Sequence, residues 1–551
     1  MNRSQRWTMV AVVVGSGVVF LDTSVVNLAL PRMAEELPST LVAPLEAQSY
    51  VTGGYFVTLS ALLILAGALT DRYGRKRVFA LGLAGFAATS LLCGLAPTME
   101  LLIAFRVLQG AAGAFVVPGS LSIITANFHG EEQGRAFGLW AGASALTTLL
   151  GPFVGGVLVN SVSWRAAFLL NLPFLALAYV ATVRHVAESR DERAGGRLDW
   201  LGSVLVVAAV AGLAFGTIRG QQVGWGTPAA MIALAVGAVA TVLVPVRMLR
   251  AADPLVPPWL FRSRNFTVTN LSTFVIYGAL YVGFTFLGLF LIGTLGYDEP
   301  AAGVALLPGD VFLALLSARF GQLAARHGPR VFMAAGPALM AVGLLLLLRV
   351  PATSDPWLLG GGGSVLPPAD YLVDLLPGLV LFGIGLAVMV APLTTALMTS
   401  VPEANAGVAS AVNNAISRVG SPLVTAVIFV VVVSGFYGAI AERVPEADVG
   451  SAAFRRQVAP LNPPADEVDQ RVAAAAREAS TDAFHLAMLV SAGLLAAGAA
   501  INGLGIRNPR PAEAPVDRRT SMAPARGCVT CETPAGAASG AGEEPARPPT
   551  G

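Results

Sequence analysis

Between two apolar runs, Val51–Leu69 and Val78–Ala96, the chain reads Gly67-Ala68-Leu69-Thr70-Asp71-Arg72-Tyr73-Gly74-Arg75-Lys76-Arg77. Each run is close to the length of about 20 residues that a transmembrane helix needs. Two membrane spans therefore meet at a very short, strongly basic turn. One carboxylate, Asp71, lies among four cations there, which indicates that the turn is held in one geometry. Gly67 and Gly74 allow close helix contact and a tight reversal.

This string resembles the signature loop between the second and third helices of the major facilitator superfamily, G-x-L-x-D-R-x-G-R-K-R. The resemblance implies two six-helix bundles that rock around a central cavity. It also implies that Asp71 meets a helix N-terminus of the opposite bundle when the cytoplasmic side is closed, since the helix dipole favours an anion there. We therefore expect a cytoplasmic gate formed by Gly67, Asp71, Arg72, Gly74, Arg75 and Lys76.

The composition indicates a membrane protein. Of the 551 residues, 55% are hydrophobic and 12% are charged, whereas about a quarter of the residues in a soluble protein are charged. A net charge of +2 gives no case for a nucleic-acid partner. Cys528 and Cys531 form a C-x-x-C in a tail rich in Pro, Gly and Ala, which predicts neither a zinc site nor a redox motif. We expect no cofactor and no metal.

Hydropathy predicts about fourteen membrane spans and hence an all-α polytopic fold. The spans are placed at residues 7–29, 47–69, 78–97, 101–124, 136–158, 166–186, 199–218, 229–249, 267–293, 300–323, 331–350, 373–398, 407–436 and 482–504. Arginine gathers in alternate loops, and the positive-inside rule places these loops and both termini in the cytoplasm. We expect a multi-pass protein of the plasma (inner) membrane, with the lipid bilayer as a partner.

An internal repeat divides the chain. Residues 321–330, Gly-Gln-Leu-Ala-Ala-Arg-His-Gly-Pro-Arg, echo the first signature loop, with Ala325 in place of Asp71. Transporters are often built from two such repeats. The register predicts an N-terminal six-helix bundle (1–186), two inserted helices with cytoplasmic linkers (187–266), a C-terminal six-helix bundle (267–506) with a long outer loop (437–481), and a disordered cytoplasmic tail (507–551). The outer loop is expected to hold at most a small capping helix.

Asp22 is the first residue that could carry chemistry. It lies about 24 Å beyond Arg6 along a helix that rises 1.5 Å per residue, where a carboxylate must be paired, hydrated or protonated. The segment 21–31 resembles L-D-x-T-x-V-N-x-A-L-P, the first helix of the fourteen-span drug:proton antiporters, with Ser24, Asn27 and Pro31 at motif positions. The alternative is a structural carboxylate that is hydrogen-bonded to Ser24, Asn27 or a neighbouring helix.

Arg106 is the second candidate. The segment 102–114 resembles the R-x-x-Q-G motif of the superfamily's fourth helix. An arginine cannot lose its proton, so its surroundings must supply acceptors or water. We expect it close to the cytoplasmic face, beside a carboxylate whose proton release it would influence. The alternative is a snorkelling arginine at a helix end.

Gly151, Pro152, Gly155 and Gly156 resemble the G-P-x-x-G-G core of a motif that marks antiporters and is absent from most symporters. Glycines at this density let two helices touch, and a proline permits a kink. The motif's preceding glycine is Thr147 here. A generic helix-packing site is the alternative.

Asp310 is a further candidate, within an apolar run at residues 301–316. It lies about 16 Å from Glu299 and about 24 Å from Arg326 along a helix. Facing a cavity, it would favour cationic substrates by charge pairing. Facing a partner such as a tyrosine, it would be structural, and the sequence leaves both readings open.

These features together are similar to the fourteen-span drug:proton antiporter family. The resemblance implies export of amphipathic drug-like or antibiotic compounds, hydrophobic or cationic, in exchange for inward-moving protons. Asp22, with Asp310, would hold either a proton or a substrate, because only an occupied, neutralised site crosses cheaply between the two facing states. We expect small molecules and protons as partners and a monomer as the working unit.

Other functions stay open at this point. A proton-coupled importer on the same fold is disfavoured by the glycine motif at 151–156, and an exporter of one narrow class of metabolite is a further alternative. An enzyme or receptor is disfavoured because the sequence has no clustered catalytic set, no polar domain and no G-x-x-x-x-G-K-[ST] loop for ATP. A structural subunit would leave Asp22 and Arg106 without purpose.

Overall fold

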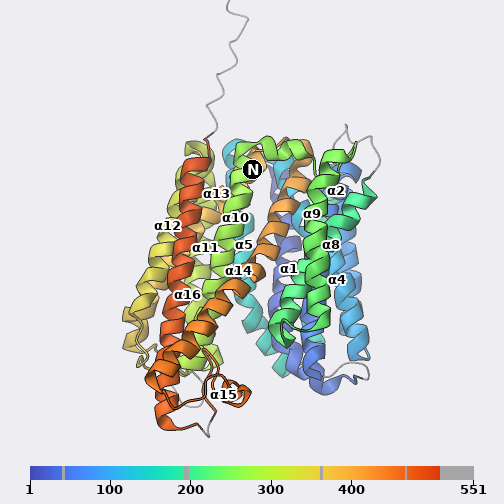
Figure 1. Cartoon of the computed structure of the whole chain (residues 1–551). Helices are drawn as coiled ribbons and strands as arrows, with labels where there is room; N and C mark the ends of the chain where they lie inside the picture. Colours follow the sequence, from blue (N-terminus) through green and yellow to red (C-terminus); the bar gives the residue numbers. More distant parts are fainter. Residues whose placement is uncertain (40–43, 191–197, 360–363, 466–467, 509–551) are drawn as a thin grey trace, which may run out of the picture. The chain divides into compact units, whose positions relative to one another are not determined.

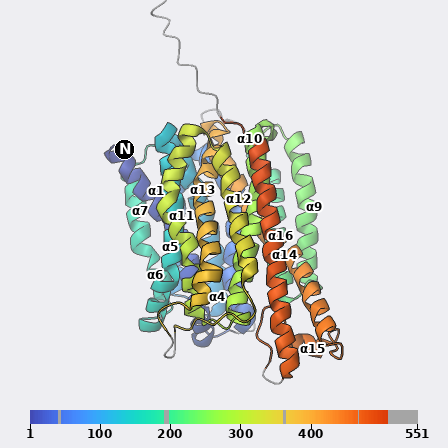
Figure 2. The ribbon, with the colours of Figure 1, turned by 90° about the vertical axis from the view of Figure 1, so that its left-hand side faces the viewer.

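The computed structural model describes residues 1–39, 44–190, 198–359, 364–465 and 468–508. Met1–Asn508 form one compact unit. The described residues form α-helices with short 3-10 and π-helical turns, and they contain no β-strand. Figures 1 and 2 show the long helices running side by side. The all-α polytopic fold is thus confirmed, whereas Cys528, Cys531 and nearly all of the predicted tail lie outside the described residues.

The first six spans pack together as one bundle. Its helices are α1 (Arg3–Glu36), α2 (Pro44–Tyr73), α3 (Arg75–Gly94), α4 (Met99–Asn127), α5 (Gly130–Ser161), and the pair α6 (Ala166–Leu169) and α7 (Asn171–His185). α1 packs against α5 and α7, while α2 and α3 pack against α4. The predicted span 166–186 is therefore divided at Leu170 into a single short turn and a longer helix.

The last six spans form a second bundle. Its helices are α10 (Arg264–Leu289), α11 (Glu299–His327), α12 (Arg330–Leu346), α13 (Leu376–Thr399), α14 (Ala406–Arg443) and α16 (Gln470–Gly505). π-helical turns at Phe290–Thr294 and Tyr371–Leu375 extend α10 and precede α13. α12 packs against α13 and α16, and α10 packs against α14 and α16.

The outer loop predicted at 437–481 is wrong in its boundaries. α14 continues to Arg443 and α16 begins at Gln470, with the expected small helix, α15 (Ala452–Gln457), between them. Hydropathy marks only the most apolar part of each helix. The Ala-rich start of α16 is a strong helix former that continues the helix beyond the hydrocarbon. Arg443 joins the two extensions, with its Nε 3.2 Å from Glu478 Oε2.

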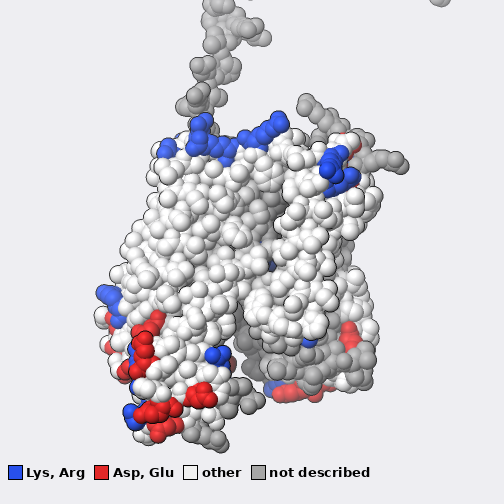
Figure 3. Space-filling view, viewed as in Figure 1, with Lys and Arg blue, Asp and Glu red and all other residues white. Residues whose placement is uncertain are grey.

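The number of spans agrees with the prediction. Thirteen helices in the described residues are long and apolar enough to cross a membrane. α5, with 32 residues, packs between α1 and α11 and adds a fourteenth. Figure 3 shows mainly Lys and Arg at the end where the N-terminus lies in Figure 1, whereas Asp and Glu lie together with some Lys and Arg at the opposite end.

The two inserted helices, α8 (Trp200–Val223) and α9 (Pro228–Arg250), form a hairpin beside the bundles. α8 packs against α2, α14 and α9. Most of α9 is exposed and apolar, with side chains such as Ile232, Val239 and Val242 more than half exposed. Such a face is suited to contact with lipid chains.

Asp199 caps α8 and joins it to α9. Its Oδ1 accepts hydrogen bonds from the backbone N–H of Gly202 at 2.9 Å and from Arg247 Nη2 at 2.8 Å. Burial alone would raise the pKa of Asp199, but the hydrogen bonds from Arg247 and Gly202 outweigh it and hold the pKa below its usual range. The carboxylate is therefore ionised at neutral pH, and the hairpin is fixed at this end.

Two glycine seams join the bundles. Gly67 of α2 lies against Gly407 of α14, and Gly321 of α11 lies against Gly134 of α5. A Cβ on any of the four would overlap the backbone opposite, so these helices approach backbone to backbone. The seams are counterparts, since the repeat places Gly67 and Gly321 at equivalent positions.

We predict that Gly321→Leu destabilises the closed arrangement of the bundles, because overpacking costs about 1–3 kcal/mol. Gly303→Leu on the same helix is the matched control, since a Cβ there meets nothing within 4 Å. The thermal unfolding midpoint of the detergent-solubilised protein measures the effect. Equal midpoints for both variants would contradict the seam.

Candidate functional site

Asp22 is enclosed in the first bundle. The residue is fully buried, and its Oδ2 accepts a hydrogen bond from Arg106 Nη1 at 2.6 Å. Its Oδ1 accepts from Gln109 Nε2 at 3.1 Å and from Asn171 Nδ2 at 2.8 Å. Ser90 Oγ, 2.9 Å from Asn171 Nδ2, completes the cluster. The structure therefore brings Asp22 and Arg106 together as one ion pair.

Arg106 has acceptors for its Nε and Nη1 groups. Besides Asp22, its Nη1 donates to Gln109 Oε1 at 2.7 Å and its Nε donates to the carbonyl of Val51 at 3.3 Å. The guanidinium also lies over the ring of Tyr55, 4.1 Å from the ring centroid. Cation–π contact and hydrogen bonds thus replace the water that a buried guanidinium loses.

The expectation that Arg106 lies close to the cytoplasmic face is wrong. Arg106 follows soon after Met99, where α4 begins, while Ser122 near the other end of α4 donates to Asp71 Oδ1 at 3.3 Å. The two positions are about 24 Å apart along the helix. α4 enters from the loop opposite the basic turn, which explains the discrepancy.

Among the described residues, the other first-helix motif residues form no hydrogen bond with Asp22. Ser24 Oγ donates instead to the carbonyl of Phe20 at 3.3 Å. Asn27 is exposed, and Pro31 lies within α1, which continues to Glu36. All three hydrogen-bond donors to Asp22 come from α4 and α7, so the partners lie on neighbouring helices.

The antiporter motif lies where α5 packs against α1. Gly151 is next to Ser24 and Gly155 is next to Val25, and both glycines are buried. Pro152 and Gly156 also lie on α5, but the described contacts do not include them. The described part of the motif brings α5 close to the helix that carries Asp22.

Asp71 connects the basic turn to the second bundle. Its Oδ1 accepts from the N–H of Gly407 at 3.0 Å, and its Oδ2 accepts from the N–H of Val408 at 2.9 Å. These amides belong to the first turn of α14, which begins at Ala406. The contact is the one that the resemblance implies for a closed cytoplasmic side.

Other residues of the turn hold it in place. Arg75 is buried, with its Nη1 3.1 Å from Glu403 Oε1 and its Nε 3.5 Å from Asp71 Oδ1. Gly74 has φ +108°, which favours glycine. The backbone N–H of Lys76 donates to Glu188 Oε1 at 3.0 Å. Charged groups thus fix the turn to the second bundle, through Glu403, and to the segment that follows α7, through Glu188.

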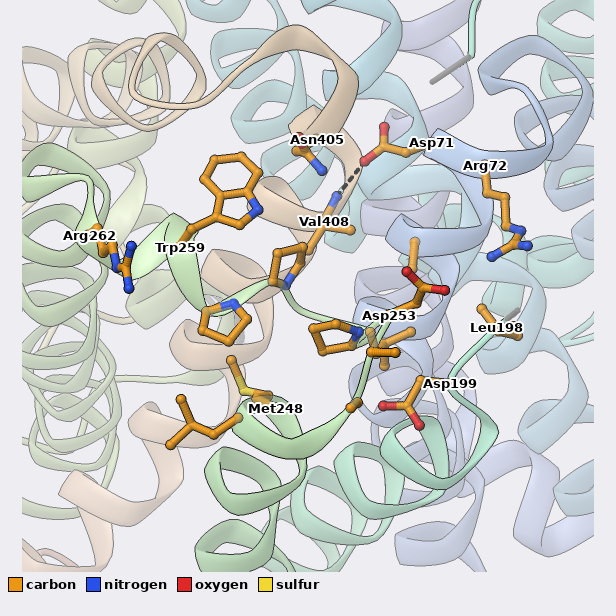
Figure 4. A pocket seen from close by; sticks show the side chains of 18 residues that line it. Asp71, Arg72, Leu198, Asp199, Met248, Asp253, Trp259, Arg262, Asn405 and Val408 are labelled. Carbon is orange, nitrogen blue, oxygen red and sulfur yellow. Dashed lines mark hydrogen bonds between the residues drawn. The ribbon is translucent and has the colours of Figure 1, made fainter. Parts of the chain in front are cut away.

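A pocket of about 600 Å³ lies beside this contact. Figure 4 shows Asp71 bonded to Val408 at its edge, with Arg72, Asp253 and Trp259 around it. The wall includes the segment that links α9 to α10. The connection between the bundles therefore passes directly beside the Asp71 contact.

A separate cavity of about 280 Å³ lies between the two bundles. Phe20 and Trp140 line it from the first bundle, and Tyr277, Asp310 and Arg418 line it from the second. Figure 3 shows the surface hollowed between the bundles at the acidic end. Asp310 lines this cavity, and among the described residues it has no hydrogen bond to a tyrosine. Of the two readings left open, the geometry fits the one in which Asp310 faces a cavity.

Arg418 was not singled out from the sequence. It lies inside the apolar run of α14, as Arg106 lies inside α4. The same signal, a permanent charge at membrane depth, could have identified it. No resemblance to a motif drew attention to it, and its position on the cavity wall depends on packing between the bundles.

Comparisons with known proteins agree with this arrangement. The family model described as Major Facilitator Superfamily matches residues 12–425. Multidrug resistance protein Stp of Mycobacterium tuberculosis is 32% identical over 429 residues, 78% of this chain and 76% of the relative. The methylenomycin A resistance protein of Streptomyces coelicolor is 33% identical, covering 75% of this chain and 82% of the relative. The tetracenomycin C resistance and export protein of Streptomyces glaucescens is 32% identical over 78% and 77%.

Solved structures share the fold at low identity. The human organic anion transporter MFSD10 aligns with a TM-score of 0.55 and 16% identity, covering 90% of this chain and all of the other. The proton:xylose symporter XylE aligns with a TM-score of 0.54 and 14% identity, covering 89% and 95%. These matches bear on the fold alone. The family model and the curated relatives, each spanning most of the chain, show that this multi-pass membrane protein belongs to the major facilitator superfamily.

Proposed function

We propose that the protein exports amphipathic drug-like or antibiotic compounds across the plasma membrane in exchange for protons. Its relatives include proteins named for multidrug resistance, for antibiotic resistance and for export. The observation that carries the proton-coupled part is the buried Asp22–Arg106 pair. Such a pair at membrane depth is costly, and intramembrane ionisable residues of transporters commonly serve in proton or substrate pathways.

The proton site and the substrate site are separate in this proposal. Asp22 is fully buried among three donors, and it does not line the cavity between the bundles. Asp310 does line it. Coupling between a proton on Asp22 and a substrate beside Asp310 would therefore depend on movement of the helices between the two sites. The proton and the substrate would not displace each other at one atom.

α1 and α5 provide a physical link between the two sites. Protonation of Asp22 removes its charge and leaves Arg106 with only neutral acceptors, which favours rearrangement of α1 against α4. Gly151 and Gly155 hold α1 closely against α5. α5 in turn supplies Trp140 to the cavity and Gly134 to a seam with the second bundle. A shift of α1 would thus reach both the cavity and the seam.

Asp71 serves as the cytoplasmic gate in this cycle. With Asp71 bonded to α14, the basic end is closed and the cavity is proposed to open to the outside, where substrate leaves. Breaking this contact would open the cytoplasmic end for the next substrate. The basic loops at this end support placing it and both termini in the cytoplasm.

One chain is sufficient for this cycle. The cavity is lined from both bundles of the same polypeptide, which supports a monomer as the working unit. Small molecules and protons are the proposed cargo. The described residues contain no group of three or more side chains suited to hold a metal ion.

We predict that Asp22→Asn abolishes proton-coupled export, because the amide cannot take up and release the proton. Inverted membrane vesicles with an acid interior are loaded with an acridine pH dye, and a panel of cationic, neutral and zwitterionic drugs is added. Wild type and the exposed control variant Asp448→Asn should show dye recovery, whereas Asp22→Asn should remain at the background of empty vesicles. Recovery by Asp22→Asn at the wild-type rate would contradict the assignment of the proton site.

We predict that Asp71→Asn opens the cytoplasmic end. Hydrogen bonds to a charged group contribute about 1.5–3 kcal/mol, and their loss would raise the open population by about 10- to 100-fold. Alkylation of Ala411→Cys, a buried position next to Gly67, reports the opening from the cytoplasmic side.

Asp253→Asn is the matched control for this gate. Asp253 lines the neighbouring pocket, but among the described contacts it has none with the first turn of α14. In the Ala411→Cys background, Asp253→Asn should be alkylated at the same rate as the protein that has no aspartate substitution. Equal rates in both aspartate variants would remove Asp71 from the gate.

A further inference from the structure

Two opposite charges share the wall of the cavity between the bundles. Asp310 lies on α11, about 24 Å from Arg326 near the cytoplasmic end of that helix. Arg418 lies on α14, about 18 Å from its first residue, Ala406. Both line the same cavity, and both side chains are partly exposed. They therefore lie at membrane depth with access to its interior.

Neither charge has a hydrogen-bond or ion-pair partner among the described residues. Two buried carboxylates elsewhere in the chain are paired. Asp22 accepts a hydrogen bond from Arg106, and Asp71 accepts one from the backbone N–H of Gly407. Asp310 and Arg418 show no hydrogen bond and no ion pair, with each other or with any other described side chain. In an open cavity water can solvate them, but closure around a substrate removes that water. A charge left alone in this way costs several kcal/mol.

Polar neighbours on the wall are already engaged. Asn413 Nδ2 donates to Thr273 Oγ1 at 2.8 Å and to Asn270 Oδ1 at 3.1 Å. Asn414 Nδ2 donates to the carbonyl of Ser410 at 2.9 Å. Asp310 and Arg418 are therefore the charged groups on the wall that are free to bind a ligand.

The rest of the wall suits an aromatic or apolar body. It is formed largely by ring and aliphatic side chains, among them Phe20, Trp140, Tyr277, Tyr281 and Phe284. A ligand that complements this wall has a flat apolar core, with one cationic and one anionic group at its edge.

We propose that Arg418 binds an anionic group of the substrate while Asp310 binds a cationic one, so that the cavity prefers zwitterionic amphiphiles. This inference rests on the proposed export function and narrows its substrate class. The guanidinium matches a carboxylate with two parallel hydrogen bonds. The wall carries one charge of each sign, so a simple cation would pair with Asp310 but leave Arg418 without a counter-charge beside a positive ligand.

Two forms of one dye test the proposal. Tetramethylrhodamine with a free carboxylate is zwitterionic, whereas its methyl ester is a cation with the same ring system. Fluorescence polarisation with the full-length protein in nanodiscs measures binding without a proton gradient. Wild type should bind the carboxylate form more tightly than the ester.

The variants should separate the two charges. Arg418→Gln should weaken binding of the carboxylate form at least tenfold and change binding of the ester less than twofold. Arg418→Lys should restore part of the loss, because it keeps the charge without the planar fork. Asp310→Asn should weaken binding of both forms. The thermal unfolding midpoint of each variant confirms that it is folded.

The proposal is overturned if wild type binds neither form, or binds the ester more tightly. It is also overturned if Arg418→Gln weakens both forms equally, which would make Arg418 a structural residue. If Arg418→Gln does not fold, the proposal is still tested by two measurements. They are the relative binding of the two dye forms by wild type and by Arg418→Lys. Binding in the expected pattern without proton-driven export of the dye would count against the proposed function alone.

Discussion

A carboxylate and a guanidinium cannot stay charged inside an apolar bundle unless each satisfies the other. Asp22 and Arg106 meet this constraint at 2.6 Å, with both residues almost completely buried. The pair needs α1 and α4 in fixed register, and Asn171 of α7 completes its hydrogen bonds. Much of the first bundle is thus organised around one charge pair. A proton that neutralises Asp22 would alter the packing of three helices at once.

The contact between the bundles follows a different principle. Gly67 and Gly407 bring two backbones together, and Asp71 then reaches the free amides of the α14 N-terminus. The second seam, at Gly134 and Gly321, has no such acid, because the repeat has Ala325 where the first copy has Asp71. The two repeats are thus alike in backbone shape but differ in charge. Of the two seams, only the one at Gly67 and Gly407 has a carboxylate bonded to backbone amides among the described residues.

Much of the fold could be predicted from the sequence, since spans of about 20 apolar residues are a strong signal. Asp22, Arg106 and Asp71 were also identifiable, because charges at membrane depth or in a short turn are rarely accidental. The boundaries of α14 and α16 were missed, because hydropathy identifies apolar segments and does not show where a helix ends. The depth of Arg106 was misjudged, and its pairing with Asp22 lay beyond the sequence, because 84 residues separate them. Arg418 carried the same signal but matched no motif.

The glycine seams have a consequence for how the protein can vary. A surface of backbone against backbone tolerates almost no increase in side-chain volume, whatever the chemistry of the new side chain. The wall around Asp310 and Arg418 borders empty space and carries no such restriction. Under selection by a changing set of toxic compounds, substitutions would therefore accumulate on that wall. The cavity wall would diversify while the two glycine seams stayed almost unchanged.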